Sequence, residues 1–187
     1  MNEFKIDRVF VTKFLGILID SDLSWKSHTT AVKNKMYKGL AILKKVKKCL
    51  NRDTMLTLYC SIVQSHLSYC IEIWGNCCKV FLAPIIKAKK FAIRLVCNLR
   101  YRDHTTTSFK KLKVLKFTDL VKYKLQLLMY KAWNVKLPKN VQSLFNVNNE
   151  NKYPTRKGLD FKVKYSKKYF ENKLYLYYRS KVVEYIK

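Results

Sequence analysis

The sequence predicts a mainly α-helical protein: a short N-terminal β-hairpin followed by an antiparallel bundle of helices. Only 4 Gly and 3 Pro occur in 187 residues, which argues against a turn-rich sandwich or barrel. Hydrophobic residues make up 49% of the chain, so we expect a packed core rather than disorder. After residue 24 the apolar residues recur every three or four positions, which is the period of a helix.

The hairpin is predicted over residues 9–20, VFVTKFLGILID, which are rich in β-branched and aromatic side chains and bounded by turn residues. Gly16 interrupts this run, where a bulge or a close approach of the backbone is expected. Because an isolated hairpin is marginally stable in water, it needs a helix or a further strand beside it.

The first long helix is predicted to begin after Ser24, a good N-cap residue. Its apolar stripe follows a 4-3-4-3 spacing through Trp25, Thr29, Val32, Met36, Gly39, Leu43, Val46 and Leu50. The opposite side of the helical wheel carries Lys38, Lys45 and Lys48. These three lysines are therefore candidates for contacts with a polyanion.

A second helix is predicted over residues 54–74, with Asp53 as its cap. Glu72 is the only charged residue between Thr54 and Cys78, which in so basic a chain suggests burial on most sides. We expect this helix to be central and His66 to be a hydrogen-bonded core histidine. The predicted inner face comprises Met55, Tyr59, Ile62, His66, Cys70 and Ile73.

A third helix is predicted over residues 82–98, with Pro84 in its first turn. Lys87, Lys90 and Arg94 are spaced by three and four and line the face opposite the apolar one. Two interpretations stay open: an ordinary solvated face, or a row of cations along a phosphate backbone. The predicted inner face comprises Ile85, Ala88, Ala92, Leu95 and Val96.

Two further helices are predicted before the chain changes character. A short one opens at His104 or Thr105, and a longer one covers residues 119–135 and ends before Pro138. From Asn146 the composition is polar, which predicts a linker and then a less ordered basic tail. The predicted divisions are thus 1–23, 24–145 and 146–187. The inner face expected for residues 119–135 comprises Leu120, Tyr123, Leu127, Tyr130 and Trp133 or Asn134.

The net charge of +27, from 39 Lys and Arg against 12 Asp and Glu, predicts a polyanionic partner. Nucleic acid is the first candidate and an anionic membrane surface the second. Only seven of the basic residues are Arg, and Asn, Tyr, Phe and Ile are also abundant. Codon drift in AT-rich DNA produces such a composition, so part of the excess needs no partner.

Catalytic and metal-binding motifs are missing: the chain has no P-loop, GxSxG, HExxH or GxGxxG. Asp20 and Asp22 form the nearest carboxylate pair, but at a strand-to-helix turn such residues usually bind local N–H groups. His66, Cys70, Cys77 and Cys78 lack the tight spacing of a zinc knuckle. We therefore expect no cofactor.

The sequence contains no run of 18 apolar residues and no signal peptide. We accordingly expect no membrane span, reduced thiols and an intracellular location, in either nucleus or cytoplasm. The oligomeric state is left open.

Five segments occur in a familiar order: KFLGILIDSDLSWKSH, LYCSIVQSHLSYCIEIWGN, KAKKFAIRLV, HTTTSFKKLKVLKFTDL and LLMYKAWNVKLP, with KYPTR near residue 153. In this order and spacing the chain resembles the C-terminal part of reverse transcriptases (RNA-directed DNA polymerases) from jockey-type non-LTR retrotransposons.

The resemblance implies that Lys13, Phe14, Leu15 and Gly16 belong to the primer-grip segment at the end of the palm. It also implies that the helices form a thumb whose basic residues touch the backbone of an RNA or DNA template–primer duplex. The family's polymerase aspartates, with the Mg²⁺ they bind, belong to motifs upstream that this sequence lacks. We therefore expect a 5′-truncated, non-catalytic fragment; a structural or interaction domain, a peripheral membrane binder and a remnant without selected activity are the alternatives.

Overall fold

The computed structural model describes residues 8–143 and 145. The chain divides into two compact units, Met1–Val121 and Lys122–Lys187, and each is described by itself. The predicted tail, residues 146–187, lies outside the described residues. The mainly helical class and the N-terminal hairpin are both confirmed.

The hairpin consists of β1 (Val11–Phe14) and β2 (Ile17–Asp20), paired antiparallel with Phe14 opposite Ile17. Leu15 and Gly16 connect the strands with φ of 46° and 82°. Two positive φ values in a two-residue loop match the right-handed twist of the strands. Gly16 is therefore a turn residue, and the strain of the positive φ falls on Leu15.

The first long helix, α1 (Lys26–Val46), buries the predicted stripe from Thr29 to Leu43. Ser24 is not its N-cap: that position is Trp25, which has a left-handed backbone, and the Ser24 hydroxyl donates to Asp20 Oδ2 at 2.8 Å. The helix also ends earlier than predicted, so Lys48 lies in the turn that follows.

The single helix predicted over residues 54–74 is wrong, because the chain changes its winding twice. It forms α2 (Arg52–Tyr59), a π-helical turn η1 (Cys60–Gln64), α3 (Ser65–Ser68) and α4 (Ile71–Trp74). Cys70 has φ of 47° and separates α3 from α4. The cap is Asn51 rather than Asp53, since its side chain accepts from Thr54 N at 2.9 Å.

These interruptions change which side chains are buried. A π-helical turn holds one more residue than an α-turn, so a spacing of four stays on one side through the segment. His66 is consequently exposed, and Ile73 is 46% exposed, which corrects both predictions. The scarcity of charged residues between Thr54 and Cys78 therefore reflects an uncharged side that is exposed to solvent, not burial on most sides. The buried set is Met55, Tyr59, Val63, Leu67, Ile71 and Trp74.

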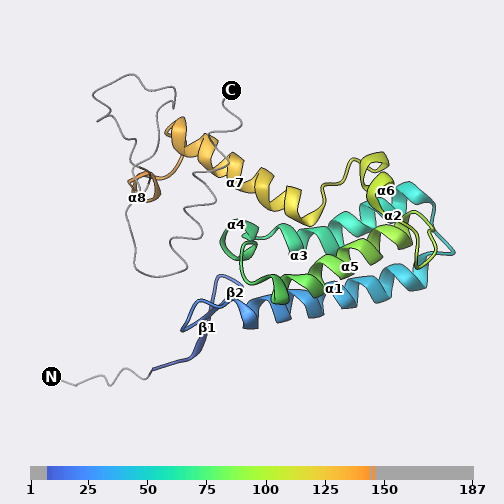
Figure 1. Ribbon diagram of the computed structural model, residues 1–187, viewed down its shortest axis with the longest axis horizontal. Helices are drawn as coiled ribbons and strands as arrows, with labels where there is room; N and C mark the ends of the chain where they lie inside the picture. Colours follow the sequence, from blue (N-terminus) through green and yellow to red (C-terminus); the bar gives the residue numbers. More distant parts are fainter. Residues whose placement is uncertain (1–7, 144, 146–187) are drawn as a thin grey trace. The chain divides into compact units, whose positions relative to one another are not determined.

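The next helix, α5 (Lys79–Val96), buries the predicted inner face. It starts earlier than expected, so Pro84 is inside the helix and has no N–H to donate to the carbonyl one turn back. Figure 1 shows α1 and α5 side by side and running in the same direction, whereas α2 and α3, which connect them in the sequence, run in the opposite direction. Gly39 permits this packing, since a Cβ there would lie 3.0 Å from the Ile62 carbonyl oxygen.

The remaining described helices are α6 (Thr106–Lys111), α7 (Phe117–Trp133) and α8 (Lys139–Gln142). Thr105 precedes α6 as predicted. The face predicted for α7 is mostly wrong: Tyr123, Tyr130 and Trp133 are 51%, 58% and 43% exposed. Tyrosine and tryptophan count as apolar in a helical pattern, but their polar groups also allow them to lie at the surface. The pattern therefore assigned the wrong side of α7 to the interior. The buried positions are Phe117, Leu120, Val121, Leu125, Met129 and Ala132.

The core histidine is His28, which joins the hairpin to the helices. Its Nδ1 accepts from Leu18 N at 3.3 Å, and its ring meets the Trp74 ring edge to face at 5.4 Å. Burial first, and then the charge of Lys35, lower the pKa of His28 below its usual value, although Asp20 opposes them. A neutral His28 is what this contact requires, because Nδ1 must be an acceptor.

Candidate nucleic-acid interface

The hairpin tip carries the residues of the predicted primer-grip segment. Lys13, Phe14, Leu15 and Gly16 are all exposed, with Phe14 at 62% and Leu15 at 74%. The tip is tied to the helices, because the Tyr69 hydroxyl donates to the Leu15 carbonyl oxygen at 2.6 Å. This segment therefore presents one cation and two apolar side chains on a fixed turn.

The lysines predicted on the outer face of the first helix are also exposed. Lys38 and Lys45 belong to α1, and Lys48 follows it. Exposed lysines of this kind are available to phosphates, and they are equally well solvated without them.

The basic row on α5 divides into two kinds of residue. Lys87 and Lys90 are exposed. Arg94 is half-buried: its Nε donates to the Asp103 carbonyl oxygen at 3.2 Å, and its guanidinium lies 5.9 Å from the centre of the Tyr101 ring. Arg94 thus also fixes the loop before α6, a structural role that sequence reasoning missed.

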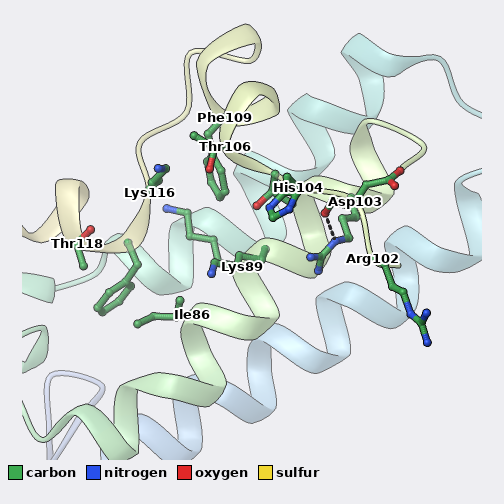
Figure 2. A pocket seen from close by; sticks show the side chains of 13 residues that line it. Ile86, Lys89, Arg102, Asp103, His104, Thr106, Phe109, Lys116 and Thr118 are labelled. Carbon is green, nitrogen blue, oxygen red and sulfur yellow. Dashed lines mark hydrogen bonds between the residues drawn. The ribbon is translucent and has the colours of Figure 1, made fainter. Parts of the chain in front are cut away.

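A cavity of about 390 Å³ opens where α5, the loop before α6 and the start of α7 come together (Figure 2). Lys90 and Arg94 line it, whereas Lys87 and the predicted lysines of the α1 region do not. Five basic side chains contribute to its wall: Lys89, Lys90, Arg94, Arg102 and Lys116.

Lys89 lines this cavity and is not among the site residues predicted from the sequence. It is 1% exposed, and no hydrogen-bond partner for its Nζ exists among the described residues. Burial lowers the pKa of Lys89 to about 8, against the opposing attraction of Asp119. The signal was present: position 89 lies four residues after Ile85 and three before Ala92, on the apolar face.

Asp20 and Asp22, the two carboxylates that come closest to forming a catalytic pair, lie just before α1. Burial tends to raise the pKa of the Asp20 carboxyl, but hydrogen bonding to Ser27, Ser24 and the Lys26 backbone holds it below its usual value. Asp22 is exposed on the adjoining turn. Two metal ions in phosphoryl transfer need carboxylates converging from separate segments. These two residues do not fit the Mg²⁺ site of a polymerase.

No helix in the described part of the chain is long and apolar enough to cross a membrane. Within residues 8–143 and 145, no three His, Cys, Asp or Glu side chains group as metal ligands would.

Comparison with known proteins gives one similarity that bears on function. No family model and no solved structure matches the sequence. Over 117 residues, 61% of the chain, it is 24% identical to a probable RNA-directed DNA polymerase from transposon X-element of Drosophila melanogaster. The aligned part spans 13% of that relative's length. This similarity supports a relationship between the chain and the reverse transcriptases of transposable elements.

Proposed function

We propose that the chain corresponds to the thumb-like, C-terminal region of a jockey-type non-LTR reverse transcriptase, which binds nucleic-acid backbone and has no polymerase activity alone. The observation that carries this proposal is α5, whose buried apolar face is backed by exposed Lys87 and Lys90. The similarity to a transposon polymerase and the net charge of +27 support it. The partner is a template–primer duplex, RNA or DNA, held by its phosphates.

Replacing Lys87 and Lys90 with Gln should weaken binding to a duplex about equally for all sequences. Fewer phosphate contacts mean that fewer counterions are released on binding, so the slope of log K against log salt should become shallower by about two. Arg94 is left intact because its contact with Asp103 supports the fold. Fluorescence anisotropy with a labelled 20-base-pair duplex at several salt concentrations measures the slope.

The matched control replaces Lys131 and Lys139, two exposed lysines of α7 and α8, with Gln. This variant loses the same charge and should keep the wild-type slope within about half a unit. An equal loss in both variants would show that the chain is a diffuse polycation, and compositional drift would then explain the charge better.

The purified chain should extend no primer when given template, dNTPs and Mg²⁺. The physical reason is that Asp20 and Asp22 do not fit a two-metal site, and the chain has no [FY]-x-D-D turn. A gel assay of primer extension measures this, with an intact reverse transcriptase as the positive control. Template-dependent extension that persists in an Asp20→Asn, Asp22→Asn variant would contradict the proposal.

The exposed hairpin favours a second candidate, a helical interaction domain whose lysines reflect drift. Val9, Phe10, Phe14 and Leu15 are 65%, 69%, 62% and 74% exposed. Exposed apolar side chains on and beside the edge strand β1 are suited to contact another protein surface. This candidate predicts duplex binding that is weak and unaffected by the Lys87 and Lys90 substitutions, so the same experiment separates the two.

A further inference from the structure

The cavity beside α5 combines cationic and apolar walls. Five of its side chains are Lys or Arg, and Thr105, Thr106 and Thr118 add hydroxyl groups. Ile86, Phe109 and Phe117 supply apolar surface. Figure 2 shows these groups arising from separate elements, with Lys89 on α5, His104 just before α6, Thr106 at the start of α6, and Lys116 and Thr118 at the start of α7. The volume of about 390 Å³ falls within the usual range for small-molecule sites.

Lys89 sets this cavity apart from a basic patch on the surface. A buried ammonium group without hydrogen bonds is strongly unfavourable, so buried charges are normally paired. Lys89 Nζ has no such partner among the described residues, and its side chain lines the cavity. The unpaired donor therefore belongs to a residue that borders a space large enough to hold an acceptor.

The acidic groups nearby are directed to other contacts. Asp103 Oδ2 accepts from Arg100 N at 2.8 Å, and the Asp103 carbonyl oxygen accepts from Arg94 Nε. Asp119 Oδ1 accepts from the Thr118 hydroxyl at 3.4 Å, and Asp119 does not line the cavity. The wall consequently presents an excess of positive charge to whatever enters.

The start of α7 adds to the same field. Leu120 N donates to the Lys116 carbonyl oxygen, which marks the first turn of the helix, and Phe117 and Thr118 line the cavity. The N–H groups of a first helical turn point away from the helix and carry a partial positive charge. Together with Lys89, this end favours an anion with several acceptor oxygens.

We infer that this cavity, built around Lys89, binds the phosphate of a nucleotide unit. A phosphate supplies acceptors for the Lys89 ammonium and for the surrounding basic groups, and the apolar walls suit the attached sugar or base. The phosphate comes either from a free nucleotide or from a nucleic-acid chain. If the phosphate belongs to a nucleic-acid chain, the inference rests on the proposed function and extends it. If the phosphate belongs to a free nucleotide, the inference is independent of the proposed function.

The test follows Lys89 itself by NMR in protein labelled with ¹³C and ¹⁵N lysine. Inorganic phosphate and thymidine 5′-monophosphate should each shift the Lys89 Cε resonance in a saturable way and raise its titration midpoint above about 8. Binding should accordingly weaken as the pH rises through that value. The other ionisable groups around Lys89 are Cys60, Lys90, Arg94, Arg102, Asp103, His104, Lys116 and Asp119.

Lys89→Met should weaken thymidine 5′-monophosphate binding by about ten- to a hundredfold, as expected for the loss of a charged hydrogen bond. Lys79→Met is the matched control, because Lys79 is exposed on the same helix and does not line the cavity, and this variant should bind like the wild type. Equal affinity of the two variants, or a Lys89 resonance that phosphate leaves unmoved, would overturn the inference.

Competition with the 20-base-pair duplex identifies the source of the phosphate. If the cavity takes backbone phosphate, the duplex displaces the nucleotide and Lys89→Met weakens duplex binding; if it takes a free nucleotide, neither effect occurs. Both results retain the phosphate site. Failure of the proposed function has a different signature: no salt-dependent duplex binding by the wild type, while Lys89 still responds to phosphate.

Discussion

Replacing Lys89 with Met is expected to raise the free energy of unfolding at pH 7. Burial depresses the pKa of Lys89 from 10.5 to about 8, so the folded state binds this proton less tightly than the unfolded state. A difference of that size corresponds to roughly 3 kcal/mol, of which we expect about 2–3 to be recovered in the variant. Urea denaturation of both proteins at pH 7 measures the difference.

The pH dependence gives this prediction a second test. Below pH 8 Lys89 is charged in both states and the full penalty applies. Between pH 8 and 10.5 the unfolded state holds more protons, so the wild type gains stability relative to the variant as the pH rises. Any stabilisation that Met provides by packing alone is independent of pH. The pH dependence of the stability difference therefore isolates the contribution of the Lys89 charge.

Lys90→Met is the control for this measurement. Lys90 is the neighbouring residue and is exposed, so its substitution should change stability by no more than about 0.5 kcal/mol. A Lys89→Met variant less stable than the wild type at pH 7 would show that the ammonium makes a favourable contact in the folded protein.

Replacing Trp74 with Ala is expected to lower the free energy of unfolding by about 3–5 kcal/mol. Trp74 is 0% exposed, and its Nε1 donates to the Tyr69 carbonyl oxygen at 3.0 Å. The indole also contacts His28 and lies 6.2 Å from the Phe117 ring. Since small domains are stable by about 5–15 kcal/mol, the variant should unfold in much less urea than the wild type.

The loss of Trp74 should also loosen the hairpin, because the His28 ring would lose its neighbour. Hydrogen exchange at Leu18 N, which donates to His28 Nδ1, should speed up more than exchange within α5. Trp133→Ala on α7 is the control: its side chain is 43% exposed, so the expected loss is well below that of Trp74. Equal losses for the two tryptophans would contradict a central role for Trp74.

The Lys89 and Trp74 predictions have opposite signs for one physical reason. Trp74 fills the core with apolar surface and satisfies its single donor, so removing it leaves a void and an unpaired carbonyl. Lys89 places an unpaired charge against the core, so removing it relieves a penalty. A residue whose loss stabilises the fold but weakens phosphate binding marks a position where stability and function compete.

Local sequence signals determined the class of the fold. The β-branched run before Asp20 and the apolar period after Trp25 are properties of a few neighbouring residues, and they located β1, β2, α1 and α5. The burial of Ile85, Ala88 and Ala92 also follows from spacing alone, since α5 is regular throughout these positions. By the same argument the spacing could have revealed Lys89, which shares that face.

Tertiary packing decided the rest. The π-helical turn at Cys60–Gln64 and the left-handed Cys70 place Val63, Leu67 and Trp74 against the core, and no local period specifies such changes of winding. The cavity draws its groups from three successive helices and the loops between them, and only their packing brings these groups together. A helical period reports only which residues share a face; whether that face meets protein, water or a ligand depends on the elements that pack beside it.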